Sequence, residues 1–182
     1  MITTGFYIPE SMEKLSKFEI ARRKIYISPQ DFRHQLNIWR FEGHKIVFTN
    51  GCFDLLHLGH VDYLAKAADL GTKLIIGLNS DFSTSGIKGP GRPITDQQSR
   101  STILASMFFV DAVILFDEAT PLSLIAAIRP DVLVKGSDYE VDQIIGADIV
   151  LASGGEVKTI KFLKGYSTTA IVDKIKTPDT QQ

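Results

Sequence analysis

The stretch KIVFTNGCFDLLHLGH, residues 45–60, joins an apolar, β-branched run to a polar turn and then to the start of a helical pattern. Residues 45–49 are typical of a strand in a parallel sheet that is covered on both faces. The helix that follows places its apolar residues at the i, i+3, i+4, i+7 spacing of a single face: Val61, Leu64, Ala65 and Ala68. Strand, turn and helix together predict one βα unit of an α/β fold.

The same alternation continues along the chain. Four further apolar runs predict strands: KLIIGL at 73–78, AVILF at 112–116, DVLVK at 131–135 and EVKTI at 156–160. Helical patterns lie between these runs, and β-α-β order implies right-handed crossovers. We therefore expect a doubly wound, mainly parallel sheet between two layers of helices, which is a three-layer α/β sandwich.

Three helices are predicted after the first. Apolar residues at 103, 104, 107 and 108 form a stripe on one of them. Another helix begins at Thr120-Pro121, as a cap followed by a first-turn proline, and ends at Pro130. The last follows the hydroxyl residues 167–169 and carries apolar residues at 171, 172 and 175 on one face.

The predicted domain occupies residues 45–176, and residues 177–182 form a polar tail. Residues 1–44 are interpreted as an N-terminal appendage with one helix at about 28–42, packing onto the domain or onto a partner. The helix that bears Trp39 is a candidate surface for self-association.

Composition excludes several classes of protein. A chain of 182 residues with 44% hydrophobic and 23% charged residues can bury a core and is not disordered. The net charge of −1 argues against a general nucleic-acid binder, and no apolar run could span a membrane. The first residues lack the pattern of a secretory signal, and the lone Cys52 can form no internal disulfide. We expect a cytoplasmic, soluble protein.

The turn at 49–60 predicts a ligand site, because open α/β sheets bind ligands at the carboxyl ends of their strands. Gly51 and Gly59 allow close approach of the backbone, and His57 and His60 lie three residues apart at the start of a helix. A helix N-terminus adds N–H donors and the positive end of a dipole. Neither a P-loop nor a dinucleotide fingerprint is present, so the pattern indicates an anion site with two imidazoles.

His57-Leu58-Gly59-His60 resembles the His-x-Gly-His motif of the cytidylyltransferase-like nucleotidylyltransferases. A series of motifs is more closely similar to the adenylyltransferase domain of ADP-heptose synthase over about residues 30–176: TNGCFDLLHLGHVDYL, LNSD, KGPGRP, VKGSDY, GGEV and GYSTTAI. The resemblance implies a Rossmann-like sheet of the nucleotidylyltransferase type. In that family the domain commonly follows a sugar-kinase domain.

The resemblance also implies a reaction. An oxygen of D-glycero-β-D-manno-heptose 1-phosphate would attack the α-phosphorus of ATP, giving ADP-heptose and pyrophosphate for lipopolysaccharide or another surface glycan, with Mg²⁺ accompanying ATP. The attacking phosphate is largely deprotonated near neutral pH, since its second pKa is about 6. Stabilising charge on the phosphates is therefore the main catalytic task.

Four residues are the expected catalytic set by this resemblance. His57 and His60 would face the α- and β-phosphates of ATP. Lys88 would reach the attacking phosphate or the α-phosphoryl group, and Arg100 would hold the sugar phosphate or a phosphate of ATP. On the residues alone, Lys88 is equally well a solvated loop lysine, and Arg100 could pair with Asp96 one helical turn away.

The expected binding residues form two groups. The nucleotide would contact Asn50, Gly51, Cys52, Phe53, Gly59, Gly136, Asp138, Tyr166, Ser167, Thr168 and Thr169. The acceptor would contact Asp54, Asn79, Asp81 and Arg92. Asp54 and Asp138 could hold Mg²⁺ through water, a ribose hydroxyl or the heptose. Any of the four residues Asp54, Asn79, Asp81 and Asp138 could simply end its strand in an Asx turn.

For the remaining residues, purely structural roles stay open as alternatives to substrate binding. Arg92 could face solvent, Ser167 could be a helix cap and no more, and Phe53 could belong to the core. Cys52 is better explained as a small buried residue than as a nucleophile. Related glycerol-phosphate cytidylyltransferases have an arginine just before the last helix, where this chain offers Lys161 and Lys164.

Two rival functions remain at this level. One is a cytidylyltransferase acting on glycerol 3-phosphate or a similar small phosphate, and the other is a nucleotide sensor without turnover. Self-association as a homodimer or larger oligomer is expected from the resemblance, and a separate heptose kinase could supply the substrate. Residues 83–93, STSGIKGPGRP, are rich in glycine and proline, so we expect an irregular loop that is mobile without substrate.

Overall fold

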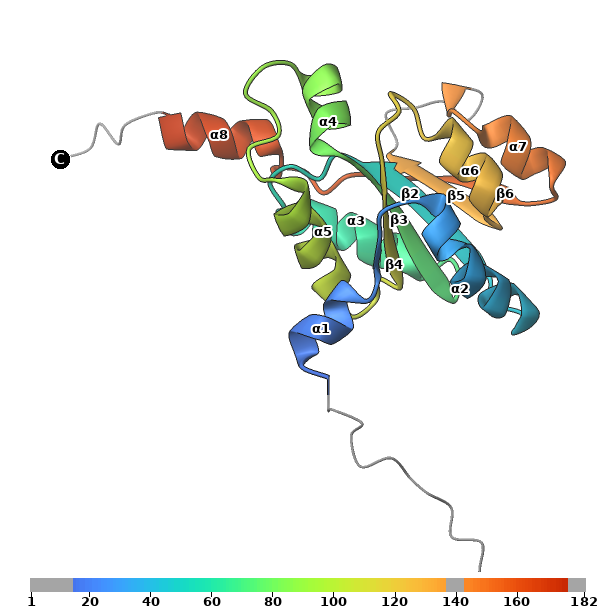
Figure 1. Ribbon diagram of the computed structural model, residues 1–182. Helices are drawn as coiled ribbons and strands as arrows, with labels where there is room; N and C mark the ends of the chain where they lie inside the picture. The colour runs from blue at the N-terminus through green and yellow to red at the C-terminus, as the bar shows by residue number, and fades with distance from the viewer. Residues whose placement is uncertain (1–14, 137–142, 177–182) are drawn as a thin grey trace, which may run out of the picture.

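The computed structural model describes residues 15–136 and 143–176. Its sheet has six parallel strands in the order β1-β4-β3-β2-β5-β6 (Figure 1). The strands are β1 (Ile25–Tyr26), β2 (Ile46–Gly51), β3 (Lys73–Asn79), β4 (Ala112–Phe116), β5 (Val132–Gly136) and β6 (Glu156–Ile160). The five predicted strands and the doubly wound α/β class are confirmed.

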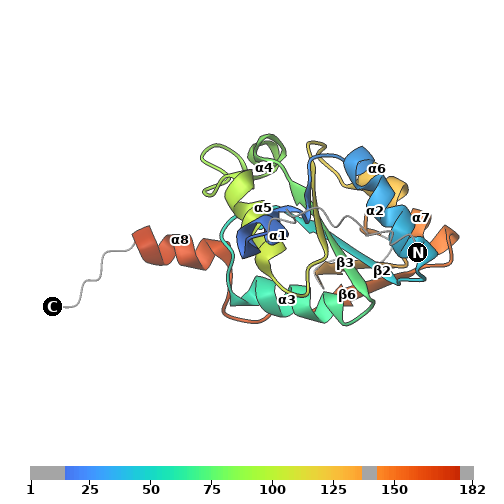
Figure 2. The ribbon, with the colours of Figure 1, turned by 60° about the horizontal axis from the view of Figure 1, so that its bottom comes forward.

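Helices cover both faces of this sheet. One face carries α1 (Lys17–Arg22), α3 (Leu58–Ala68) and α5 (Gln97–Ser106), and the other carries α2 (Pro29–Phe41), α6 (Leu122–Ile128) and α7 (Ala147–Ala152) (Figure 2). Alternate residues of one strand feed the two cores: Val47 packs in the cluster with α3 and α5, and Phe48 packs in the cluster with α2 and α6. This alternation is the period-2 geometry of a strand buried on both faces.

The N-terminal segment belongs to the same packing unit as the predicted domain. Helix α2 buries Phe32, Leu36 and Trp39 in the cluster that contains Phe48, and β1 lengthens the sheet by pairing with β4. Trp39 is therefore committed to the core of its own chain rather than to an exposed surface. Ser28 caps α2 by accepting from the N–H of Asp31. Neither β1 nor α1 was predicted, because each is too short to show a period.

The stripe predicted for α5 is only partly right. Leu104 and Ala105 are buried, whereas Ile103 and Phe108 are 50% and 92% exposed. The helix ends at Ser106, and the extended backbone of Met107 ends the helical spacing before Phe108. Helix α6 begins one residue later than predicted, at Leu122, with Pro121 in the cap position.

The expectation of an irregular loop at 83–93 is wrong for its first half. Residues Asp81–Lys88 form helix α4, which Ser80 caps by accepting from the N–H of Ser83. Ser83 is buried and donates to the carbonyl of Glu118, so tertiary contacts support a helix of low propensity. The irregular part begins at Gly89, and Lys88 is the last residue of α4.

The last helix, α8 (Thr168–Lys176), extends from the carboxyl edge of the sheet away from the sandwich (Figures 1 and 2). It has no buried residue, so the apolar face predicted for it is not covered by the described part of the chain. None of the described helices combines the length and the apolarity that crossing a membrane requires.

Candidate active site

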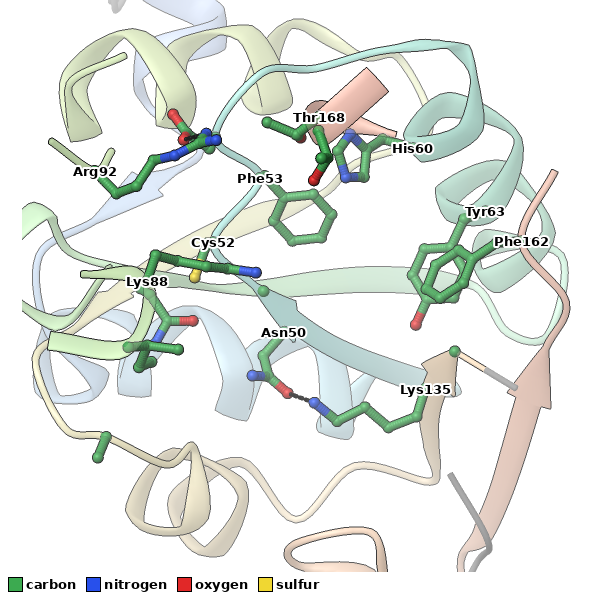
Figure 3. A pocket seen from close by; sticks show the side chains of 17 residues that line it. Asn50, Cys52, Phe53, His60, Tyr63, Lys88, Arg92, Lys135, Phe162 and Thr168 are labelled. Carbon is green, nitrogen blue, oxygen red and sulfur yellow. Dashed lines mark hydrogen bonds and ion pairs between the residues drawn. The ribbon is translucent and has the colours of Figure 1, made fainter. Parts of the chain in front are cut away.

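A pocket of about 500 Å³ lies at the carboxyl ends of β2, β3 and β5 (Figure 3). This is the position that the switch in strand order predicts, because β3 and β5 leave β2 in opposite directions across the sheet. The lining residues are Asn50, Gly51, Cys52, Phe53, Asp54, His60, Tyr63, Asn79, Ile87, Lys88, Arg92, Ala119, Lys135, Gly136, Phe162, Thr168 and Thr169.

The two histidines form a stacked pair at the start of α3. Their ring centroids are 3.9 Å apart with an interplanar angle of 18°, and His57 occupies the N-cap position without a side-chain capping bond. Burial lowers the pKa of both rings, and together with the neighbouring His57 it lowers the pKa of His60 to about 4. Both rings are therefore neutral near pH 7, and each can donate one N–H without carrying charge.

Tight backbone packing gives the pair its orientation. A Cβ placed on Gly59 would lie 3.0 Å from Nδ1 of His57 and 3.1 Å from Cβ of Tyr166, so a larger residue would push α3 away from the segment before α8. Phe53 adopts a left-handed φ of 46°, and its ring lies edge-on to His60 with centroids 5.3 Å apart. Because Phe53 is buried, its ring gives the imidazole of His60 a fixed surface to pack against.

Asp54 fixes the loop that follows α4. Its carboxylate accepts from Nη1 of Arg92 at 2.6 Å and from the backbone N–H groups of Ile94 and Thr95 at 2.6 and 3.2 Å. Burial acts to raise the pKa of Asp54, but the hydrogen bonds from Arg92, Thr95 and Ile94 outweigh it and lower the pKa. Asp54 is thus ionised, and its charge balances that of Arg92.

Arg100 lies behind the pocket wall rather than in it. Its side chain is 1% exposed and donates to the carbonyls of Thr95, Cys52 and Asn79. Nη2 pairs with Asp81 at 2.7 Å, whereas Asp96, the alternative partner, caps α5. These bonds hold the guanidinium against the ends of β2 and β3, and the expected phosphate contact of Arg100 stays a prediction. Asp81 likewise does not line the pocket.

Two lysines line the pocket from opposite sides of β2. Lys88 enters from the end of α4, beside β3. Lys135, the last but one residue of β5, was not among the expected site residues; it donates from Nζ to Oδ1 of Asn50. Burial lowers the pKa of Lys135 to about 8. The available signal was a lone cation closing the apolar run DVLVK at the carboxyl edge of the sheet.

The start of α8 closes one side of the pocket. Thr168 and Thr169 line it, and the hydroxyl of Ser167 accepts from the N–H of Ala170 as a cap. Tyr166 packs against Gly59 but does not line the pocket. Lys161 and Lys164 are exposed and outside the lining set.

The aromatic wall on the β5 side was also missed. The ring of Phe162 lies over Gly136, where an added Cβ would meet it at 2.3 Å, and tilts against Tyr63 with centroids 5.3 Å apart. Asn79 lines the pocket and donates to Ser83. Asp138 lies outside the described residues.

Comparison with known proteins places this geometry in a family. The cytidylyltransferase-like family model matches residues 48–174, which include both histidines, both pocket lysines and the start of α8. The chain belongs to the cytidylyltransferase-like family.

This cytidylyltransferase-like chain has curated relatives that are longer than itself. It is 50% identical to the bifunctional protein HldE of Magnetococcus marinus over 79% of this chain and 29% of that protein. It is 47% identical to the bifunctional protein HldE of Pseudomonas fluorescens over 96% of this chain and 36% of that protein. The chain spans about a third of the length of these relatives.

A solved structure shares the fold. The lipopolysaccharide core biosynthesis protein of Thermoplasma volcanium is 30% identical, with a TM-score of 0.54, and the match covers 69% of this chain and all of that one. The expected Rossmann-like nucleotidylyltransferase fold is therefore confirmed.

Proposed function

We propose that the chain transfers AMP from ATP to a sugar 1-phosphate, namely D-glycero-β-D-manno-heptose 1-phosphate, giving ADP-heptose and pyrophosphate. The observation that carries this proposal is the pocket itself, which brings His60, Lys88 and the first turn of α8 around one cavity, with His57 stacked on His60 outside the lining set. The ordered motifs shared with the adenylyltransferase domain of ADP-heptose synthase and the relatives named above support the choice of substrates.

The geometry suits phosphoryl chemistry that needs no general base. A sugar phosphate is already a nucleophile near neutral pH, so the neutral His60 is free to donate its N–H to oxygens on which negative charge develops. Thr168 and Thr169 would present hydroxyl and backbone N–H groups from the N-terminus of α8 to the departing pyrophosphate. Lys88 would neutralise the attacking phosphate.

The two arginines are proposed to position the pocket and the acceptor rather than to contact the reacting phosphorus. Arg100 holds the carbonyls at the ends of β2 and β3, and so we propose that it positions the floor of the pocket. Arg92 lines the pocket, with part of its guanidinium bound to Asp54, and its proposed role is to hold the acceptor at the loop after α4.

Mg²⁺ is proposed to accompany ATP rather than to occupy a site made of side chains. Within residues 15–136 and 143–176 no three His, Cys, Asp or Glu side chains form a group that could hold a metal ion. Asp54 is engaged by Arg92 and two backbone N–H groups. The triphosphate would supply most of the ligands, as is usual for Mg²⁺.

The substrate also implies a supplier. A sugar 1-phosphate is made by phosphorylation of the anomeric hydroxyl, so we propose that a heptose kinase acts before this chain in the cytoplasm. Self-association as a homodimer or larger oligomer belongs to the same proposal, and light scattering at several protein concentrations tests it.

A four-way assay tests the function. ATP and CTP are each incubated with heptose 1-phosphate and with glycerol 3-phosphate, Mg²⁺ is present throughout, and released pyrophosphate is measured. We expect turnover with ATP and heptose 1-phosphate above the other three pairs. Preferred turnover with CTP and glycerol 3-phosphate would establish the rival cytidylyltransferase. Nucleotide binding without pyrophosphate release from any pair would establish a sensor.

A further inference from the structure

The pocket carries less positive charge than its residue types suggest. His57 and His60 are neutral near pH 7 because their pKa values are lowered. Arg92 is paired with the ionised Asp54, and Arg100 lies outside the lining set, paired with Asp81. Yet the proposed reaction brings two polyanions together, so cations in the cavity must offset their repulsion.

Two lining lysines remain to do this. Within the described part of the chain, neither Lys88 nor Lys135 has a carboxylate at ion-pair distance. Lys88 belongs to the β3 side of the pocket and Lys135 to the β5 side, with the end of β2 between them (Figure 3). The two positive charges are therefore placed for two different anions.

Lys135 is prepared for an anion by its surroundings. Its ammonium group is desolvated, and the partner that the structure gives it is the uncharged amide oxygen of Asn50. Asn50 also lines the cavity, so the bond holds Nζ at the pocket surface and leaves donors for a ligand. A desolvated cation gains more from an incoming anion than a hydrated one does.

The two sides of the pocket differ in chemistry. On the β5 side the ring of Phe162 lies over Gly136 and packs against the ring of Tyr63, and the two rings form an aromatic wall. On the β3 side the lining includes Asn79 and the Arg92–Asp54 pair. Aromatic surface suits a nucleobase, whereas polar groups suit a sugar that carries several hydroxyls.

We propose that Lys135 is a nucleotide-binding residue whose ammonium, held by Asn50, contacts the phosphates of ATP, while Lys88 serves the acceptor phosphate. The proposal rests on the proposed function for the identity of the two substrates. It adds a cation that the motif resemblance did not assign, and it divides the pocket into a nucleotide side at β5 and an acceptor side at β3.

Binding without turnover tests the first part. Calorimetry with α,β-methylene ATP, in which the scissile bond is blocked, gives Kd for the wild type and for Lys135→Gln. Glutamine can still donate to Asn50 but carries no charge, which protects the fold. We expect Kd to rise at least about tenfold, which is about 1.4 kcal/mol, because the variant loses a charge-assisted hydrogen bond to the phosphates.

Two comparisons make the result specific. Lys158→Met removes a half-exposed lysine of β6 that pairs with Glu156, and it should bind the analogue as the wild type does. Lys88→Gln should change Kd for the analogue less than threefold. A Lys135→Gln protein that is folded by circular dichroism and binds within twofold of wild type would overturn the proposal, as would a larger effect at Lys88 than at Lys135.

Steady-state kinetics separate this proposal from the proposed function. Lys135→Gln should raise KM for ATP and leave KM for heptose 1-phosphate within about twofold. If the wild type binds the analogue and Lys135→Gln does not, but no heptose phosphate is turned over, the proposed acceptor fails and the nucleotide role of Lys135 stands. A rise in KM for the acceptor alone would overturn the division of the pocket.

Discussion

Replacing Arg100 by methionine should lower the free energy of unfolding of the protein and not only weaken a contact with substrate. The side chain is 1% exposed and supplies hydrogen bonds to the carbonyls of Cys52, Asn79 and Thr95. Methionine fills much of the same volume but donates nothing. Each buried acceptor left without a donor costs about 1–3 kcal/mol.

The total cost for the three carbonyls is reduced because the surrounding structure can relax and water can enter the space left by the guanidinium. Breaking a buried charged network typically costs about 3–5 kcal/mol, and we expect Arg100→Met to lie in that range. For a chain of this size each kcal/mol lowers Tm by roughly 2–4 °C, so Tm should fall by about 6–20 °C. Urea unfolding followed by circular dichroism gives the free energy of unfolding, and differential scanning fluorimetry gives Tm.

Asp81→Asn is the matched control. It removes the charge of the group that pairs with the buried Arg100, but the amide oxygen of asparagine can still accept from Nη2, and the 42% exposed side chain at position 81 stays open to water. Its Tm should therefore stay close to wild type. If Arg100→Met keeps its wild-type Tm and loses only activity, the guanidinium binds substrate and our reasoning about its buried hydrogen bonds is refuted.

Further expectations concern residues that line the cavity and His57, which stacks on one of them. His57→Ala and His60→Ala should each lower kcat by about 10²–10³ while circular dichroism stays native, as expected on removing one preorganised donor; turnover like that of wild type in either variant would contradict the assignment. Burial and the neighbouring His57 lower the pKa of His60 to about 4 in the folded chain, whereas in the unfolded chain the pKa of a histidine is about 6.5. Between these two pH values the unfolded chain therefore binds a proton at His60 that the folded chain does not bind. Stability should thus be complete above pH 6.5 and fall toward pH 4, and a His60→Gln protein should show a shallower loss of Tm in that window; equal slopes would contradict it. Lys88→Met should reduce kcat/KM at least about tenfold, or roughly 1.4 kcal/mol, with little change in Tm, and the reverse pattern would make Lys88 structural. ATP should be preferred over CTP in kcat/KM with heptose 1-phosphate, and a clear preference for CTP would move the chain to the rival subfamily.

The sheet was predictable from sequence because its signal is local. Strands such as 73–79 and 112–116 are buried on both faces, so most of their residues are apolar, and each strand includes β-branched residues. The glycines and histidines of residues 49–60 also gave a local signal, since they stand where a strand must turn into a helix. These parts of the fold and the site could be placed without knowing what they contact.

Features that depend on distant contacts could not be predicted. Helix α4 contains Gly86 and five polar residues, and the buried Ser83 that supports it donates to the carbonyl of Glu118, 35 residues away. Lys135 meets Asn50 across 85 residues of sequence. The hydrogen bonds of Arg100 could not be predicted because its partners are backbone carbonyls at the ends of two strands. Every residue has a backbone carbonyl, so the sequence does not indicate which of them a side chain contacts.

Helix α8 has a consequence for how variants of this protein are selected. It supplies Thr168 and Thr169 to the pocket, yet it buries none of its nine residues. So short a helix is marginal in water unless something stabilises it, and an anion at its N-terminus is such a stabiliser. A library of variants ranked by the Tm of the unliganded protein would therefore retain substitutions in α8 that impair ligand binding. Ranking the variants by the rise in Tm that ATP produces would remove them.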